Sequence, residues 1–493
     1  MKRLKGLILI SMGLLYPITT LFAQSYAEGA LMISRTYQGG TARVQGMGGA
    51  QMALGGDPSV AGSNPAGLGM SNRSSVSITG NLFNENVNSI YYNNRSTSMA
   101  SNFNLPQAGA IFFRPSADKE EGFQGGAFSV NYTMADNYHH KGRYETQNPD
   151  ESIIDYMLYA VDGLSPYEFG ETGSETNSLL GLGWYTYLID TIDGFYDSYI
   201  LDYPTIQGEE TFNRGRQGRW DFSYGGNFAD KVFFGGGISI SRFKYFSEKR
   251  YSESFSSNMI SGIEVDENLH IDGAGFSAVV GVIGRPLDFL QIGVSYRTPT
   301  LYNVNDEYDA KVTAYWNGFN YSDTEVLNTI EDQTAILYSD YSIRAPGKLS
   351  LGIAGFFGKQ GFVTADFERT DYRAVRLDSR DINFQDDNDL FSTQQQVAYN
   401  FRIGGEFRYK IFRFRAGGAL YGDPNKSSSL VDSSVRQVTF GAGLKKEAFS
   451  VDFALVNNSF ETAYFPYLIN GEGHLVESKT NQMNSMVTVG FSF

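Results

Sequence analysis

The second half of the chain is built from short segments in which every second residue is apolar. In residues 487–493, Val and Phe alternate with Thr, Gly and Ser, and the same division recurs at 399–408, 437–444 and 449–455. A period of two places successive side chains on opposite faces of a β-strand. Each segment therefore predicts a strand with one apolar face and one face of small or polar side chains.

Two kinds of fold can use such strands. In a soluble sandwich the apolar face points inward to a core, whereas in an outer-membrane barrel it faces the lipid and the polar face lines the lumen. The chain offers fourteen such segments, an even number. They lie at 75–83, 106–115, 122–138, 217–228, 231–247, 268–284, 287–298, 343–357, 360–375, 395–409, 411–421, 434–445, 447–459 and 483–493.

The connections between the predicted strands favour the barrel. Tight turns, such as those at 229–230, 285–286 and 359–360, follow even-numbered strands, and long polar loops follow odd-numbered ones. This asymmetry is typical of bacterial outer-membrane barrels, in which both chain ends lie on the periplasmic side. The sequence therefore predicts an all-β membrane protein, a 14-stranded antiparallel transmembrane β-barrel over residues 75–493. The final Phe493 agrees, because such barrels commonly end in an aromatic residue that the barrel assembly machinery reads.

The N-terminus indicates secretion. Basic residues within the first five positions precede an apolar run at 7–15, and Ala23 is a small residue before a plausible cleavage site. A single membrane anchor is the alternative, disfavoured because the apolar stretch is short and Pro17 interrupts it. No cysteine follows the leader, which excludes a lipoprotein. We therefore expect residues 1–23 to be a signal peptide.

Composition agrees with a secreted barrel. Of the 493 residues, 32 are Tyr, 37 Phe and 3 Trp, so 15% are aromatic; 55 are Gly, and only 19% are charged. Soluble domains carry about 25% charged residues. No internal apolar run approaches the roughly 18 to 20 residues of a membrane helix. The lack of cysteine excludes a disulfide scaffold. The net charge of -15, which becomes -18 without the leader, disfavours a nucleic-acid partner.

Two predicted loops, 139–216 and 299–342, are too long to be simple connections, and loops of this length usually have a function. Both carry helical signals, and Asn-Pro-Asp-Glu at 148–151 indicates a helix start. The apolar residues that follow allow two interpretations: they pack the loops against each other, or they wall an apolar landing groove outside the cell. The residues that would form this external groove are Ile154, Met157, Leu158, Leu180, Trp184, Leu327 and Ile330.

The most specific motif precedes the first strand. Residues 24–74 are rich in Gly, Ala and Ser and include Gly-Met-Gly-Gly-Ala at 46–50 and Ser-Asn-Pro-Ala-Gly-Leu at 63–68. This segment resembles the N-terminal hatch of the FadL-type outer-membrane transporters of long-chain fatty acids and other hydrophobic compounds. Residues 345–354 and 364–372 resemble the eighth and ninth strands of that family, whose strand number is also fourteen.

The resemblance implies a plugged barrel. It makes residues 24–74 a hatch inside the lumen and places Tyr26 near an internal ligand pocket, from which movement of the hatch would release the ligand. In the family, ligand is thought to leave sideways through the wall at a kinked third strand, here 122–138, in which Gly125 and Gly126 would tolerate distortion. The residues of the hatch motif are Asn64, Pro65, Ala66 and Gly67.

The function implied is passive uptake of long-chain fatty acids or other hydrophobic small molecules by a monomer in the outer membrane of a Gram-negative bacterium. Lipid, lipopolysaccharide and the barrel assembly machinery are the other expected partners. Relatives are also labelled hemin receptors or aromatic-hydrocarbon transporters, so the cargo stays open. The alternative is an outer-membrane binding, adhesion or haem receptor that uses the large external loops. A general porin is disfavoured because the hatch should block ion flow.

Catalysis and cofactors are not expected. The four histidines are His139, His140, His270 and His474, and no G-x-S-x-G motif occurs. The adjacent pair could ligate haem, but exposed neighbouring histidines are more often solvated.

Two groups of charged residues each allow a structural and a functional interpretation. The acids at 381, 386, 387 and 389 could hold calcium, although the spacing of an EF-hand is absent and a solvated acidic loop is favoured. Several arginines point into the lumen on the alternation, where we expect them to pair with the hatch rather than with an acidic cargo head group. They are Arg402, Arg408, Arg413 and Arg415.

Overall fold

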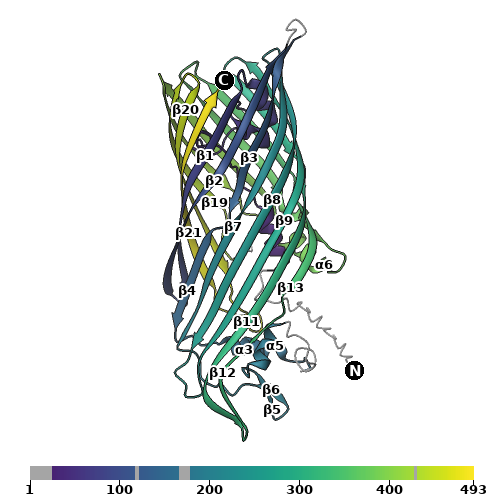
Figure 1. Ribbon diagram of the computed structural model, residues 1–493, viewed down its shortest axis with the longest axis vertical. Coiled ribbons are helices and arrows are strands. Elements are labelled where there is room, and N and C mark those ends of the chain that lie inside the picture. Colours follow the sequence, from purple (N-terminus) through teal and green to yellow (C-terminus); the bar gives the residue numbers. More distant parts are fainter. Residues whose placement is uncertain (1–24, 117–121, 166–177, 427–429) are drawn as a thin grey trace, which may run out of the picture.

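The chain folds into one closed antiparallel barrel of fourteen strands (Figure 1), as the alternation predicts. The computed structural model describes residues 25–116, 122–165, 178–426 and 430–493, and the predicted signal peptide lies outside these residues. In order around the wall, the strands are β1 (Ser75–Tyr91), β2 (Asn94–Pro115), β3 (Phe123–Asn137), β7 (Ile206–Phe228), β8 (Val232–Ser254), β9 (Ile260–Leu287), β10 (Leu290–Arg297), β14 (Lys348–Phe356), β15 (Gly361–Asp371), β17 (Val397–Tyr409), β18 (Phe412–Tyr421), β19 (Val435–Lys446), β20 (Phe449–Tyr464) and β21 (Val476–Ser492).

The first and last strands close the ring. β1 pairs with β21 from Ser75 opposite Ser492 to Ile90 opposite Glu477. The predicted turn at Ala229 and Asp230 is present: both residues have positive φ, and the Lys231 N–H donates to the Phe228 carbonyl at 3.1 Å. The turn predicted at 285–286 is wrong by three residues, because β9 continues to Leu287 before the chain reverses.

Several strands are much longer than predicted. The stretch 84–105, expected to be a loop, is a hairpin in which β1 and β2 continue to a turn at Tyr92 and Asn93. Residues 299–342 are also strand rather than helical loop. They form β11 (Thr300–Ser322), β12 (Glu325–Gln333) and β13 (Leu337–Ala345), which extend the wall beyond β10 and β14.

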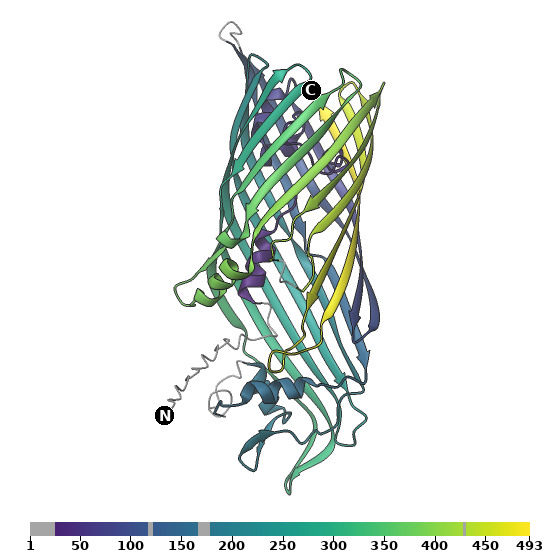
Figure 2. The ribbon, with the colours of Figure 1, turned by 180° about the vertical axis from the view of Figure 1, so that it is seen from behind.

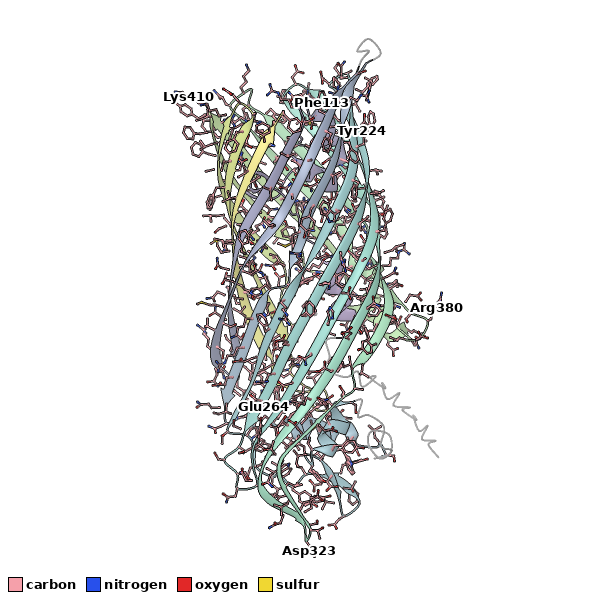
Figure 3. The ribbon with its side chains drawn as sticks, in the orientation of Figure 1. Phe113, Tyr224, Glu264, Asp323, Arg380 and Lys410 are labelled. Carbon is pink, nitrogen blue, oxygen red and sulfur yellow. The ribbon has the colours of Figure 1, made fainter. Side chains whose placement is uncertain are left out.

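The outer surface of the wall changes character along each strand. On β8, Ile238 and Ile240 face outward and are about half exposed, and the next outward residues are Arg242 and Lys244. The apolar part is the band that lies in the bilayer. β9 has 28 residues, far more than the 9 to 11 that cross a bilayer, so its other half stands outside the membrane. Figure 3 shows Tyr224 near one end of the barrel, and Glu264 and Asp323 toward the other.

The extended end carries additional elements. β4 (His140–Gln147) continues the line of β3, and β16 (Arg376–Asp378) pairs with β13. α3 (Ile153–Val161), α5 (Leu179–Tyr185) and the small hairpin β5 (Asp190–Ile192) and β6 (Phe195–Asp197) form a cap at this end (Figure 2). α6 (Gln385–Gln394) follows a short η3 (Tyr372–Ala374) on the side of the barrel. Among the described residues, no helix is long and apolar enough to cross a membrane.

The hatch occupies the lumen. Its elements are α1 (Tyr26–Ser34), α2 (Ala42–Gln45), η1 (Pro58–Gly62) and η2 (Pro65–Met70). α1 lies about halfway along the barrel, beside α6, and the other three lie between it and the end with short turns (Figures 1 and 2). β21 ends at that short-turn end. The first described residues lie about halfway along the lumen, and the predicted N-terminus of the mature chain, at residue 24, lies outside the described residues.

Candidate functional site

The hatch motif fastens the hatch to itself and to the wall. The Asn64 side chain caps η2 by accepting from the Ala66 N–H, and its Nδ2 donates to the Met52 carbonyl at 2.7 Å. Pro65 occupies the first position of η2, where no backbone donor is needed. Gly67 is required for close approach, because a Cβ there would lie 2.4 Å from the Leu54 carbonyl oxygen. All four motif residues are buried.

Further hydrogen bonds anchor the hatch to strands on different sides of the barrel. Asp366 on β15 accepts from the backbone N–H groups of Gln51 and Met52 at 2.8 and 3.1 Å. Ser223 on β7 donates to the Ala61 carbonyl at 2.8 Å. Thr488, on β21, accepts from a hatch N–H at 2.7 Å. Moving the hatch as one body would break all of these buried contacts together, and each buried group left unpaired costs about 1–3 kcal/mol.

A layer of ion pairs on β15, β17, β18 and β20 lies beside the hatch. Arg402 lies 3.3 Å from Glu368, and Arg415 lies 2.8 Å from Glu406 and 2.7 Å from Asp452. Arg408 also pairs with Glu406, whereas Arg413 donates to carbonyls of the adjacent turn. Of the hatch residues, Arg43 joins this layer, at 3.5 Å from Glu406. The predicted lumen arginines therefore pair mainly with acids of the wall rather than with acids of the hatch.

A cavity of about 430 Å³ lies in the lumen between α1, the hatch and one side of the wall. Its apolar lining includes Met32, Phe83 and Met486, and its polar lining includes Asn81 and Glu85. Its volume falls within the range of small-molecule sites. Sequence reasoning did not find this cavity, because its lining comes from strands far apart in the chain, from β1 to β21.

The wall beside the cavity has an interruption. Backbone pairing of β2 with β3 ends at Gln107 opposite Thr133, and β3 has a register shift between Met134 and Asp136. Pro106 comes just before Gln107 on β2, and proline has no N–H to donate to a neighbouring strand. We call the line between residues 94–106 of β2 and residues 134–147 of β3 and β4 the seam.

Side chains close the seam in place of backbone pairs. Ser98 donates to the Lys141 carbonyl at 2.5 Å, and the Asn102 and Asn137 side chains meet at 3.4 Å. Pro106 on one side of the seam and residues 134–140 on the other also line the cavity. On its outer side, Phe103 belongs to the exposed apolar band. Beside the cavity, hydrogen bonds made by side chains rather than backbone pairs therefore join the two sides of the seam.

The glycines predicted as a gate lie elsewhere on the same strand. Gly125 has φ +129 and follows a register shift, yet it still pairs with Pro115, and Gly126 pairs with Arg114. They lie where the β2–β3 ladder is intact. Gly125 and Gly126 thus lie at the other end of β3 from the seam, and their role as a lateral gate stays a prediction.

Tyr26 does not line the cavity. It packs edge-on against Tyr341 and Phe384, with ring centroids 5.4 and 5.1 Å away, and its hydroxyl bonds Ser339. The apolar face of α1, with Ala30 and Ile33, is buried against β8, β9, β11 and β13. α1 thus lies on the β8–β13 side of the lumen, opposite the part of the cavity lining that comes from β1, β20 and β21. The placement of Tyr26 at the pocket is corrected: the α1 residue that reaches the cavity is Met32.

The residues predicted to form an external groove do come together, in one cluster that covers the external end of the lumen. Ile154, Met157 and Leu327 are buried in it. The other four pack against it and are partly buried: Leu158, Leu180, Trp184 and Ile330. In this structure the cluster packs the loops and strands together, which is the simpler of the two interpretations. Leu327 and Ile330 lie on β12 rather than on a helix, because the hairpin β11–β12 continues the wall.

α3 is present as predicted, but it starts later. Ser152 rather than Asn148 is its cap, with a capping box to Asp155. Glu253 on β8 accepts from the Ile153 N–H at 2.8 Å and from the Ser152 hydroxyl at 2.6 Å. Burial raises the pKa of Glu253. A wall carboxylate at the positive end of the helix thus holds the cap on the barrel.

Among the described residues, the histidines and the acidic loop form no metal site. His140 lies 2.7 Å from Glu85, and His270 stacks on Phe246 at 4.1 Å. His139 contacts Phe212 edge-on, and His474 stacks on a tyrosine. Within the described residues, no three His, Asp or Glu side chains are arranged to hold a metal ion.

Solved structures of other proteins share this geometry. No protein-family model matches the chain, and no curated protein matches it significantly. Solved structures do match. A FadL homologue from Pseudomonas aeruginosa has a TM-score of 0.55 at 12% identity, over 93% of this chain and 99% of that one.

This chain has the FadL-type fold.

Two further structures agree. The toluene transporter TodX of P. putida has a TM-score of 0.53 at 14% identity, and the toluene transporter TbuX of Ralstonia pickettii 0.51 at 16%. In each case the match covers 92% of this chain and 99% of the other. The resemblance read from the hatch motif and the strand number is confirmed at the level of the fold. Within the FadL-type fold, the features particular to this chain are its cavity lining, its seam and its tall external wall.

Proposed function

We propose that this protein is a channel of the Gram-negative outer membrane for passive uptake of hydrophobic small molecules, a class that includes long-chain fatty acids. The observation that carries the proposal is the placement of the cavity. The anchored hatch lies between the cavity and the short-turn end of the barrel. On the other side the seam, which lacks backbone pairs, borders the cavity.

The proposed path has three steps. A hydrophobic molecule first binds among the apolar side chains of the external end, with the groove residues Met157 and Trp184 in the part that must loosen. It then passes α1, whose apolar face would exchange contacts with the wall for contacts with the ligand. It leaves the cavity through the seam into the outer leaflet. No step requires the hatch beyond residue 41 to move.

Passive movement is consistent with the energetics of such a ligand. Burial of apolar surface gains about 25 cal/mol per Å², so transfer from water to the cavity and then to lipid is downhill for an apolar molecule. Lipopolysaccharide presents a polar layer at the cell surface, and the tall external wall would carry ligand across that layer. We further propose that the C-terminus is periplasmic, that the barrel works as a monomer and that the barrel assembly machinery inserts it.

Uptake by whole cells tests the proposal. A Gram-negative strain without its own hydrophobic channel is compared with the same strain carrying this protein, using radiolabelled toluene and a radiolabelled long-chain fatty acid. We expect at least one compound to enter several-fold faster. Heat-modifiable migration confirms that the barrel is folded in the membrane. Unchanged uptake of every compound by a folded barrel would refute a channel and favour a binding protein, and a large steady conductance in planar bilayers would indicate a porin.

A further inference from the structure

Three cations lie on the outer face of β7 and β8, directly beyond the apolar band. They are Arg216, Arg242 and Lys244, and all three are exposed. They point outward, because the adjacent Gln217 donates to the hatch and the adjacent Phe243 is buried against α1. The two strands run side by side across the front of the barrel in Figure 1. We call these three residues the basic patch.

Like charges face each other in the basic patch. Arg216 is the cross-strand partner of Lys244, and Arg242 lies next to Lys244 along the same face. Like charges directly opposite each other destabilise a sheet. None of the three forms an ion pair with a described residue, and the acid nearest in the register is Asp272, opposite Lys244 on β9. Three cations and one acid leave an excess of two positive charges.

The basic patch is a local feature of the wall. On β1, the outward residues that follow the apolar band are Asn84 and Asn86, which are neutral. Elsewhere on the external wall, cations are neutralised by acids within 4 Å. Those paired in this way include Arg214, Arg250, Lys311 and Lys479.

Aromatic side chains place the basic patch at the membrane surface. Trp220, on the same outer face of β7 as Arg216, packs on Tyr132 of β3 with ring centroids 5.3 Å apart. Trp and Tyr form girdles at the level of the lipid headgroups. Tyr132 leans over Gly218, the cross-strand partner of Arg242, so that a Cβ at Gly218 would lie 2.5 Å from the Tyr132 hydroxyl. The hydroxyl therefore lies beside the patch.

An excess of positive charge at the level of the headgroups fits an anionic lipid. We infer that the basic patch binds a phosphate monoester of lipid A, the lipid anchor of lipopolysaccharide, in the outer leaflet. A phosphate monoester carries a charge of about -1.5 to -2 at neutral pH, which matches the patch better than the singly charged phosphodiester of a phospholipid. Arginine holds phosphate oxygens through paired N–H donors, and Tyr132 adds a hydroxyl. The acyl chains would lie on the apolar band over Ile238 and Ile240.

This inference rests on the orientation given in the proposed function, with the long strands outside the cell. It goes beyond that function, because it names the lipid that borders the seam. Asn137, a residue of the seam, is the β3 partner of Arg216. A hydrophobic compound that leaves through the seam would therefore enter the leaflet beside lipopolysaccharide.

Native mass spectrometry of the purified barrel in detergent tests the inference. The probes are lipid A with its phosphates, the same lipid A after enzymatic dephosphorylation, and phosphatidylglycerol. We expect lipid A to bind at least tenfold more tightly than either of the other two lipids. The triple variant Arg216→Gln/Arg242→Gln/Lys244→Gln should bring lipid A to within about threefold of its dephosphorylated form.

A matched variant controls for net charge. Arg250→Gln/Lys311→Gln/Lys479→Gln removes three cations that already have acid partners, so the preference for lipid A should remain. Heat-modifiable migration shows that each variant is folded. The inference would be overturned if the native barrel bound lipid A no more tightly than dephosphorylated lipid A or phosphatidylglycerol. A preference that survives in the variant of the basic patch would also overturn it.

Uptake by whole cells separates this inference from the proposed function. A barrel that binds lipid A through the basic patch but carries no hydrophobic compound into cells would leave the inference standing and refute the channel. A barrel that carries such compounds but shows no preference for lipid A would refute the inference and leave the channel standing.

Discussion

The same strands run through both halves of the barrel, but their apolar face points outward in the membrane half and inward in the external half. In the membrane half of β9, Phe276 and Val280 face outward and are more than half exposed. In the external half of the same strand, Ile263, Val265 and Ile271 face inward and are buried. Lipid covers the outer face of the first half, so its apolar side chains point out and the lumen holds a polar hatch. Water covers the outer face of the second half, so apolar side chains turn inward and form a core.

This difference assigns separate roles to the two halves. The membrane half is held by its ladder, its ion pairs and the hatch, all of which resist motion. The external half is held by an apolar core that resembles the interior of a soluble protein, and such a core can exchange one apolar partner for another. Entry of a hydrophobic ligand is therefore expected to change the external half and α1 while the membrane half stays rigid.

Truncation of a core residue in the external half should have the largest effect. Ile263→Ala removes a fully buried side chain, and we expect a loss of about 2–5 kcal/mol in the stability of the external half. Hydrogen exchange of α3 measures this loss. The matched variant Val280→Ala, on the lipid face of the same strand, should leave exchange of α3 unchanged. Equal effects of both variants would contradict a division into two halves.

A charge on the outer face should have the next largest effect, and only in the membrane half. Val282→Arg places a cation against lipid, which costs about 2–4 kcal/mol near the bilayer centre. Asn268→Arg places the same group on the external part of the same strand and should cost less than about 0.5 kcal/mol. Urea unfolding in lipid vesicles measures both. A similar cost at the two positions would show that the external half is also covered by lipid.

A smaller effect is expected from pH at the junction of the two halves. Burial raises the pKa of Asp306, on the external part of β11, to about 6. The ordinary value is about 4, so the folded state takes up a proton as the pH falls through 6, and the packing of α1 gains about 1 kcal/mol between pH 7.5 and pH 5. Hydrogen exchange of α1 should slow over that range.

Two variants define the source of this pH dependence. Asp306→Asn should slow exchange of α1 at pH 7.5 and remove most of the dependence, because the amide carries no charge. Asp309→Asn, on the outer face of the same strand, should leave the dependence as it is. If Asp306→Asn still shows the full dependence, another group controls the packing of α1.

The membrane half is the part that the sequence predicts well. All fourteen strands follow from alternation, because lipid imposes a strict division between outer and inner faces, as at 487–493. Beyond the membrane that division disappears. The outward residues Asn84, Asn86 and Asn88 are polar while the strand continues, so the pattern no longer indicates a strand. The pattern therefore predicts a loop where the hairpin of β1 and β2 continues.

The sequence likewise predicts the hatch motif better than it predicts the cavity and the seam. Asn64, Pro65 and Ala66 are contiguous and act locally, so the sequence shows them as a motif, and the family resemblance implies their place in the hatch. The cavity joins residues as distant as Asn81 and Asn484, and the seam depends on where a ladder stops, which a single sequence does not show. Pro106 in a strand was the one available signal for the seam.

The most direct test of the channel is to lock the seam. The native chain has no cysteine, so Asn102→Cys/Asn137→Cys can be joined by a short thiol-reactive cross-linker that dithiothreitol removes. We expect uptake of a hydrophobic probe to fall at least tenfold when the pair is cross-linked and to recover on reduction. A pair across the intact β1–β21 ladder, Asn86→Cys/Asn481→Cys, should leave uptake unchanged. Full uptake through a cross-linked seam would contradict lateral exit and require a path past the hatch.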